Sequence, residues 1–219
     1  MTEAVIFDVD GTLVDTNYLH AVTWWEAFRQ YGHGVDMAAV HRAIGMGSDK
    51  LLDQLLPDDR DRDEDDAIRA AHKTLYRLFW KRLRAFDGAA DLLRACAALG
   101  LKVVLASSAE GDEMEALRAA LDADDAITAA TSSADAEESK PAPDIVQVAL
   151  ERAGVPADRA IFVGDTVWDV RACQKAGLPC IAVLTGGIGA DEVREAGAVA
   201  VYDGPAHLLA ELDRSPIAE

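Results

Sequence analysis

Short apolar runs alternate with helical patterns along most of the chain. The runs lie at residues 4–7, 102–106, 160–163, 180–184 and 198–202, with a weaker one at 126–129. Each is short and rich in β-branched residues, as are strands of a parallel sheet that is buried on both faces. Helical patterns lie between them at residues 89–99, 112–123, 141–153, 167–176 and 190–196. The alternation predicts an α/β fold with a Rossmann-like, doubly wound parallel sheet.

One long segment interrupts this alternation. Residues 15–87 contain only helical patterns, the first at 18–31 and the last at 64–84. An all-helical insertion after the first strand would lie over the carboxyl end of that strand, where ligands of open α/β sheets bind. We therefore expect an α/β core made of residues 1–14 and 88–219, and a helical cap made of residues 15–87. Hinges are expected near residues 15–16 and 86–88.

The charge balance and the cysteines limit the classes of function. The chain has 21 Lys and Arg against 39 Asp and Glu, a formal net charge of −18. This acidity argues against binding to nucleic acid or to an anionic membrane, because both need clustered basic residues. The cysteines at 96, 173 and 180 form no CxxC pair, which favours reduced, buried thiols and a cytoplasmic protein. We expect a soluble protein and, by default, a monomer.

Acidic residues crowd the end of the first predicted strand, in the sequence DVDGT. Asp8 and Asp10 are two residues apart, so their side chains face the same way in an extended chain. Two carboxylates about 4 Å apart repel each other by roughly 4 kcal/mol at an effective dielectric near 20, so something must compensate. An EF-hand calcium loop is excluded, because Gly11 is fourth instead of sixth in the motif. An ordinary capping turn remains an alternative for the pair taken alone.

Two further motifs supply groups that can hold an anion. Ser107 and Ser108 follow the strand predicted at 102–106 and offer hydroxyl and backbone N–H donors. Lys140 precedes Pro141, which suits the first turn of the helix predicted to begin there. Lys140 would then lie beside the positive end of that helix and face a bound anion. A solvated surface lysine is the alternative.

The sequence GDTVWD brings two more acids to the end of another predicted strand. Asp165 and Asp169 follow the run at 160–163, and their spacing of four places both on the first turn of the next helix. Capping of the helix N-terminus could account for one of these acids but does not need both.

Taken in order, these motifs resemble those of the haloacid dehalogenase-like hydrolase superfamily. The likeness extends from residue 5 to about residue 202, and the helical insertion is similar to the small α-helical cap of that superfamily. The branch that the chain resembles is the one of phosphoglycolate phosphatases and β-phosphoglucomutases. The motifs that carry the likeness are DVDGT at 8–12, Ser107, Lys140 and GDTVWD at 164–169.

The resemblance implies a Mg²⁺ ion, which prefers oxygen ligands, at the acidic cluster. Asp8 and Asp165 would bind the ion through their side chains and Asp10 through its backbone carbonyl. Asp169 would order these ligands from behind, and Thr12 would hydrogen-bond locally. A metal held in this way would compensate the repulsion between the carboxylates.

The resemblance also implies a reaction through a covalent intermediate. Asp8 would attack phosphorus and form an aspartyl-phosphate. Asp10 would protonate the leaving alcohol and then take a proton from the attacking water. The phosphate oxygens would be held by Ser107, by backbone N–H groups near Ser108 and by Lys140.

Other reactions of related enzymes remain as alternatives. Dehalogenases and phosphonate-cleaving relatives lack the second aspartate, which this chain has as Asp10, although Lys50 resembles the cap lysine with which phosphonatases form a Schiff base. β-Phosphoglucomutases share a cap histidine comparable to His20, but Asp49 stands where they offer an arginine. A metabolite-binding regulatory protein is the non-enzymatic alternative. We expect a Mg²⁺-dependent phosphatase for a small phosphorylated metabolite, with His20 and Lys50 as possible substrate contacts.

Overall fold

The computed structural model describes residues 1–109, 111–132, 135 and 138–218. Its six strands form one sheet in the order β3-β2-β1-β4-β5-β6, and every pair of neighbours is parallel. The strands are β1 (Ala4–Phe7), β2 (Lys102–Leu105), β3 (Ala129–Ala130), β4 (Ala160–Gly164), β5 (Cys180–Val183) and β6 (Ala200–Tyr202). The predicted doubly wound α/β fold is confirmed.

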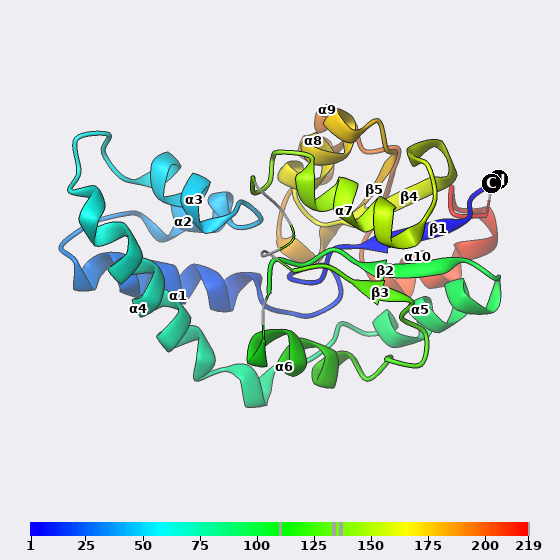
Figure 1. The fold of residues 1–219 in the computed structure, drawn as a ribbon, viewed down its shortest axis with the longest axis horizontal. Coiled ribbons are helices and arrows are strands. Elements are labelled where there is room, and N and C mark those ends of the chain that lie inside the picture. The colour runs from blue at the N-terminus through cyan, green and yellow to red at the C-terminus, as the bar shows by residue number, and fades with distance from the viewer. Residues whose placement is uncertain (110, 133–134, 136–137, 219) are drawn as a thin grey trace.

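Helices cover both faces of the sheet (Figure 1). Val5 and Phe7 of β1 belong to the hydrophobic cluster on the side of α5, α6 and α10, whereas Ala4 and Ile6 pack on the side of α7 and α8. Because both sides of the strand are buried, its sequence is apolar throughout instead of alternating. The helices are α5 (Ala89–Ala98), α6 (Asp112–Leu121), α7 (Asp144–Ala153), α8 (Val167–Ala176), α9 (Ala190–Ala196) and α10 (Pro205–Ala210).

Several details of the predicted elements are wrong, among them the helix predicted at 64–84, which ends at Arg77. The weak strand begins only at Ala129, because Ala126 closes a turn in which its N–H donates to the carbonyl of Ala123 at 3.0 Å. The helix predicted from Pro141 begins at Asp144, because a turn comes first. Asp165 lies between β4 and α8, and only Asp169 is on the first turn of that helix.

The segment between β1 and α5 is helical and has a hydrophobic core of its own. It contains α1 (Asn17–Gln30), α2 (Met37–Ala43), α3 (Ser48–Leu55) and α4 (Asp65–Arg77). Trp24, Phe28, Leu52 and Ile68 are buried together in this core. The four helices lie to one side of the sheet, at the left in Figure 1. We propose that residues 15–87 form the cap and that the remaining residues form the core.

The two chain segments that connect the helices to the sheet run side by side. Val14 forms an antiparallel bridge with Ala85. The N–H of Asp15 donates to the carbonyl of Arg84, and the N–H of Phe86 donates to that of Leu13, both at 2.9 Å. We propose that the hinges of the cap lie here.

The remaining features bear on the chain's surroundings. None of the helices in the described part of the chain has the length and apolar character needed to cross a membrane. All three cysteines, Cys96, Cys173 and Cys180, are buried and form no disulfide.

Candidate active site

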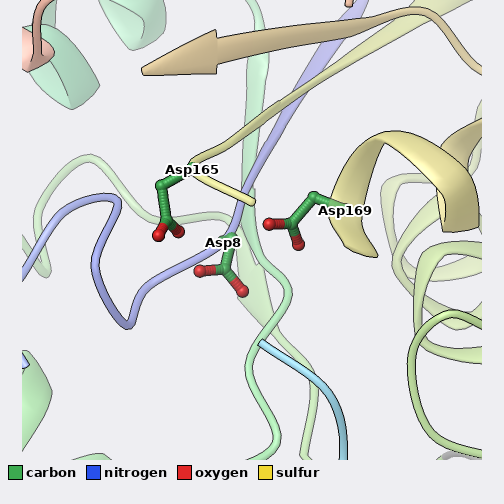
Figure 2. A group of neighbouring side chains, drawn as sticks. All are labelled: Asp8, Asp165 and Asp169. Carbon is green, nitrogen blue, oxygen red and sulfur yellow. The ribbon is translucent and has the colours of Figure 1, made fainter. Parts of the chain in front are cut away.

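Three carboxylates from separate parts of the chain converge at the end of β1 (Figure 2). Asp8 follows β1, Asp165 follows β4, and Asp169 lies in the first turn of α8. β1 and β4 are parallel neighbours, so their carboxyl ends meet at one edge of the sheet. One oxygen from each acid lies within 4.8 Å of the other two, and all three residues are buried. We call this group the acidic cluster.

Lys140 is the cation of the acidic cluster. Its Nζ lies 2.5 Å from Oδ1 of Asp8 and 2.7 Å from Oδ1 of Asp169. Asp165 instead accepts hydrogen bonds from two neutral groups, Oγ1 of Thr12 and Nδ2 of Asn17, each at 2.7 Å. The three carboxyl groups of the cluster thus have one ammonium group among them, and it contacts two of them.

The pKa values of the cluster reflect this imbalance. Burial raises the pKa of Asp8 to about 7, although Lys140 acts in the opposite direction. Burial and the nearby charges of Asp169 and Asp8 raise the pKa of Asp165. For Lys140, burial would lower the pKa, but the charges of Asp169 and Asp8 outweigh it and raise the pKa. The acidic cluster therefore has more negative charge than Lys140 can balance.

The acidic cluster has the chemistry of a site for a hard divalent cation. Its donors are oxygens, which Mg²⁺ prefers, and an added cation would balance the excess negative charge. Oδ1 of Asn17 is buried there without a hydrogen-bond partner among the described residues. Oδ2 of Asp169 accepts from the N–H and Oγ1 of Thr166, at 3.0 and 2.6 Å, while its Oδ1 faces Lys140. With both oxygens engaged, Asp169 is better suited to holding its neighbours than to binding the ion.

The side chain of Asp10 lies outside the acidic cluster. Its Oδ1 accepts a hydrogen bond from Oγ1 of Thr16 at 2.8 Å and lies 3.3 Å from Nε2 of His20. Burial alone would raise the pKa of Asp10, but the hydrogen bond and charge of His20, together with Thr16, lower it. Burial would likewise lower the pKa of His20, yet Asp10 raises it. This pairing favours an aspartate and an imidazolium beside the cluster.

A cavity of about 410 Å³ lies between the acidic cluster and the helices α1–α4. Asp8, Asp10 and Lys140 line it from the core. Trp24, His72 and the loop from Ile44 to Asp49 line it from the helical segment. The loop is tied to the core, because Oγ of Ser139 donates a hydrogen bond to Oδ1 of Asp49 at 2.5 Å. The helical segment therefore lies closed over the carboxylates.

The other residues singled out in the sequence are distributed unevenly around the cavity. Ser108 lines it. Ser107 is buried, is not part of the lining, and accepts a hydrogen bond at Oγ from the N–H of Ala109 at 3.0 Å. Lys50 is also absent from the lining, and its Nζ lies 3.6 Å from Oε2 of Glu138.

Several residues at the site were not predicted from the sequence. Thr16 and Asn17 directly precede or begin a helix, where polar residues are ordinary caps, so nothing local indicated their contacts with Asp10 and Asp165. His72 is a single histidine within a helical pattern and offered no signal of its place in the cavity.

Several known proteins are similar to this chain. A family model described as haloacid dehalogenase-like hydrolase matches residues 2–177. Phosphoglycolate phosphatase from Rhodospirillum rubrum is 30% identical over 216 residues, which covers 93% of this chain and 88% of the relative. Protein SUPPRESSOR OF QUENCHING 1, chloroplastic, from Arabidopsis thaliana is 31% identical over 191 residues, covering 83% of this chain, but the match spans only 18% of that relative's length.

A solved structure shares the whole fold. The crystal structure of a hydrolase from Pseudomonas syringae superposes with a TM-score of 0.91 at 30% identity, covering 97% of this chain and 99% of that one. The arrangement of core and helical segment is therefore shared with an experimentally determined hydrolase.

Proposed function

The chain belongs to the haloacid dehalogenase-like hydrolase family and is a phosphatase of that family, and from this premise we propose that it hydrolyses small phosphate monoesters with the help of Mg²⁺. The observation that carries the proposal is the position of Asp8. Its carboxylate lies on the floor of a covered cavity, next to Lys140 and within 4.8 Å of oxygens of Asp165 and Asp169. A nucleophile and a cation thus line one cavity, and oxygens that can bind a metal lie next to them.

In the first step, an oxygen of Asp8 forms a bond to phosphorus while the bond from phosphorus to the leaving oxygen breaks. Asp10 gives that oxygen a proton, which it takes in turn from the imidazolium of His20 beside it, so the alcohol leaves neutral. Asp10 suits this role because its side chain is held apart from the acidic cluster by Thr16 and His20. A bound Mg²⁺ supplies charge neutralisation on the phosphoryl oxygens.

In the second step, water attacks the phosphorus of the aspartyl-phosphate. Asp10, now ionised, takes a proton from the water, and the bond between phosphorus and the oxygen of Asp8 breaks. Inorganic phosphate leaves, and the proton passes from Asp10 back to His20, which restores the pair. The low pKa of Asp10 favours the ionised form that this step needs.

The roles of the remaining residues follow from their positions. Lys140, which lines the cavity beside Asp8, would hold a phosphate oxygen, and Ser108, which also lines it, would contribute a further donor. Ser107, which is buried beneath the lining, would support the segment that carries Ser108 by accepting the hydrogen bond from the N–H of Ala109. We place Mg²⁺ on Asp8 and Asp165 with the backbone carbonyl of Asp10, while Asp169 and Thr12 orient these groups through hydrogen bonds.

Two alternative activities have less support from the cavity. A phosphosugar mutase must grip a second phosphate, yet the cap loop presents the acidic Asp49 to the cavity. A phosphonatase would need Lys50 free to reach the substrate, yet Lys50 pairs with Glu138 and is not part of the lining. We also propose a cytoplasmic location, because the three cysteines are buried and unpaired, and a monomer as the default state.

The proposal is tested with p-nitrophenyl phosphate, an aryl phosphate that needs no recognition beyond the phosphate. We expect Mg²⁺-dependent hydrolysis that a chelator abolishes. Asp8→Asn should remove turnover, whereas Asp15→Asn, which changes an exposed carboxylate nearby, should not. Appreciable turnover by Asp8→Asn would refute the covalent route, and hydrolysis unaffected by the chelator would refute the metal.

A further inference from the structure

The cavity lining carries acids besides Asp8 and Asp10. Asp49, Glu113 and Glu138 are part of it. Nζ of Lys50 lies 4.0 Å from Oδ2 of Asp49 and 3.6 Å from Oε2 of Glu138 but is not part of the lining. Two acids beside one lysine leave the wall formed by Asp49 and Glu138 with a net negative charge.

The basic residues of the described lining are already paired or uncharged. Lys140 pairs with Asp8 and Asp169, and His20 pairs with Asp10. The remaining one, His72, is kept neutral because burial, and then the neighbouring His20, hold its pKa well below the usual value. The lining thus offers no cation to a second anionic group on a substrate.

His72 is held in a defined orientation by its neighbours. Its ring stacks on Trp24, with centroids 4.0 Å apart and planes inclined by 8°. Its Nδ1 lies 3.0 Å from Oγ1 of Thr23. The histidine is thus held in one orientation, and both His72 and Trp24 line the cavity.

The protonation of His72 follows from the partners of Thr23. Oγ1 of Thr23 lies 2.9 Å from the carbonyl oxygen of Leu19 and 3.1 Å from that of His20. Both carbonyls can only accept, and the contact to Leu19 is the shortest of the three that this hydroxyl makes, so we place its single proton there. Nδ1 of His72 is then the donor in its contact with Thr23. In a neutral imidazole the other nitrogen, Nε2, is therefore an acceptor, and within the described chain it has no hydrogen-bond partner.

We propose that the cavity selects phosphate monoesters whose remote part is uncharged and carries hydroxyl groups, with His72 as the residue that reads a hydroxyl through Nε2. The inference rests on the proposed phosphatase function and deepens it. A hydroxyl donates a hydrogen bond to Nε2. A carboxylate or a second phosphate is instead repelled by the lone pair of Nε2 and by the acids of the wall. Rejection of an unwanted substrate by unpaired or like-charged groups is an effective source of specificity.

The first test compares substrates of similar size in the holoenzyme. Glycerol 1-phosphate and erythritol 4-phosphate are the uncharged polyols, 2-phosphoglycolate and 3-phosphoglycerate are the carboxylates, and p-nitrophenyl phosphate is the reference. We expect kcat/KM to favour the polyols by at least about tenfold, the effect of one well-placed hydrogen bond or of an avoided charge repulsion. Equal or better hydrolysis of the carboxylates, with the reference cleaved, would overturn this inference alone. Failure to cleave the reference would overturn the proposed function and this inference with it.

The second test changes His72, the residue that recognises the hydroxyl group. His72→Phe keeps a flat ring on Trp24 but removes the acceptor, so the ratio of kcat/KM for the polyol to that for p-nitrophenyl phosphate should fall about tenfold. His207→Phe, an exposed histidine on α10 outside the lining, is the matched control and should leave the ratio unchanged. Replacement of the acids in Asp49→Asn/Glu138→Gln should raise the ratio of carboxylate to polyol hydrolysis. Unchanged ratios in both variants would contradict the assignment.

A third measurement does not depend on activity. Imidazole ¹⁵N NMR of the Mg²⁺-loaded protein at neutral pH should show His72 with the proton on Nδ1 and none on Nε2. A proton on Nε2, in either the neutral or the charged ring, would overturn the role of His72 as an acceptor.

Discussion

Nδ2 of Asn17 donates a hydrogen bond to Oδ2 of Asp165 at 2.7 Å, so the first residue of α1 contacts an acid that follows β4. The other side-chain atom of this amide, Oδ1, is buried without a partner in the described chain. The helical segment therefore starts inside the acidic cluster and orients one of its carboxylates.

Removal of this amide should weaken metal binding. For Asn17→Ala we expect the affinity for Mg²⁺ to fall by about tenfold or more, as is usual when a group that orients a metal ligand is lost. Isothermal titration with Mg²⁺, or Mn²⁺ binding followed by electron paramagnetic resonance, measures this directly. Gln30→Ala, at the exposed end of the same helix, is the control. An unchanged dissociation constant for Asn17→Ala would show that Asp165 needs no such support.

The raised pKa of Asp8 predicts how pH affects the metal-free protein. The folded protein keeps the Asp8 proton up to about pH 7, whereas the unfolded chain releases it near the ordinary value of 3.8. Between these values the unfolded state has fewer protons bound, so rising pH lowers the free energy of unfolding. The contribution of Asp8 to the Tm of the metal-free protein should therefore decrease from about pH 4 to about pH 7.

Two comparisons isolate this contribution. Asp8→Asn should flatten the dependence and raise the metal-free Tm at pH 8, by about 2–4 °C for each kcal/mol of repulsion relieved, while Asp15→Asn should not. Stabilisation of the wild type by Mg²⁺ should increase as pH rises through 7, because the metal competes with the Asp8 proton. Thermal melting with and without Mg²⁺ from pH 5 to 8 tests both expectations. If the Tm of Asp8→Asn depended on pH in the same way as that of the wild type, Asp8 would not be the group responsible.

The close approach of Gly186 to Asp165 predicts a strong effect of one methyl group. A Cβ on Gly186 would lie 1.8 Å from Oδ2 of Asp165, closer than any real contact, so the carboxylate must move. We expect Gly186→Ala to lose at least about tenfold in both Mg²⁺ affinity and kcat/KM. Gly34→Ala adds the same methyl group where no atom lies within 4 Å and should match the wild type. Wild-type metal affinity in Gly186→Ala would mean that the cluster tolerates displacement of Asp165.

The pair formed by His20 and Asp10 predicts a shift of the pH–rate profile. His20→Phe keeps an aromatic ring against Tyr76, whose centroid lies 4.0 Å from that of His20, but removes the hydrogen bond and charge that lower the pKa of Asp10. The pKa of Asp10 should then rise, and the profile of kcat/KM for an alkyl phosphate should move to higher pH. A profile that keeps its position would argue against Asp10 as the proton-transferring group.

The meeting of Asp8 and Asp165 was implied by the resemblance of the motifs to a known family, and the sheet topology explains it. Asp8 and Asp165 each follow a continuous apolar run, and the ends of neighbouring parallel strands must meet. Predicted starts of elements were less accurate where turns intervene. Pro141 is compatible with a first helical turn, but the N–H of Ala142 bonds to the carbonyl of Ser139 and delays the helix to Asp144.

Contacts across the cavity could not be predicted, because they depend on how the helices pack. Thr23 and His72 are 49 positions apart, and only the packing of α1 on α4 brings them together. The protonation of His72, and with it the chemistry of that wall, exists only in the folded protein. Asn17 likewise looks like any polar residue at a helix start until Asp165 is placed beside it.

The bonded pair of connections at Val14 and Ala85 limits how the cavity can open. A cap attached through two connections that are hydrogen-bonded to each other would rotate about that attachment but would resist sliding along it. Points close to the axis of a swing travel least, and Asp10 is bridged to Val14 itself. Asp10, the proposed proton donor, would therefore stay beside Asp8 while the cavity opens to release the alcohol and admit water. The proposed mechanism requires this, because Asp10 acts in both of its steps.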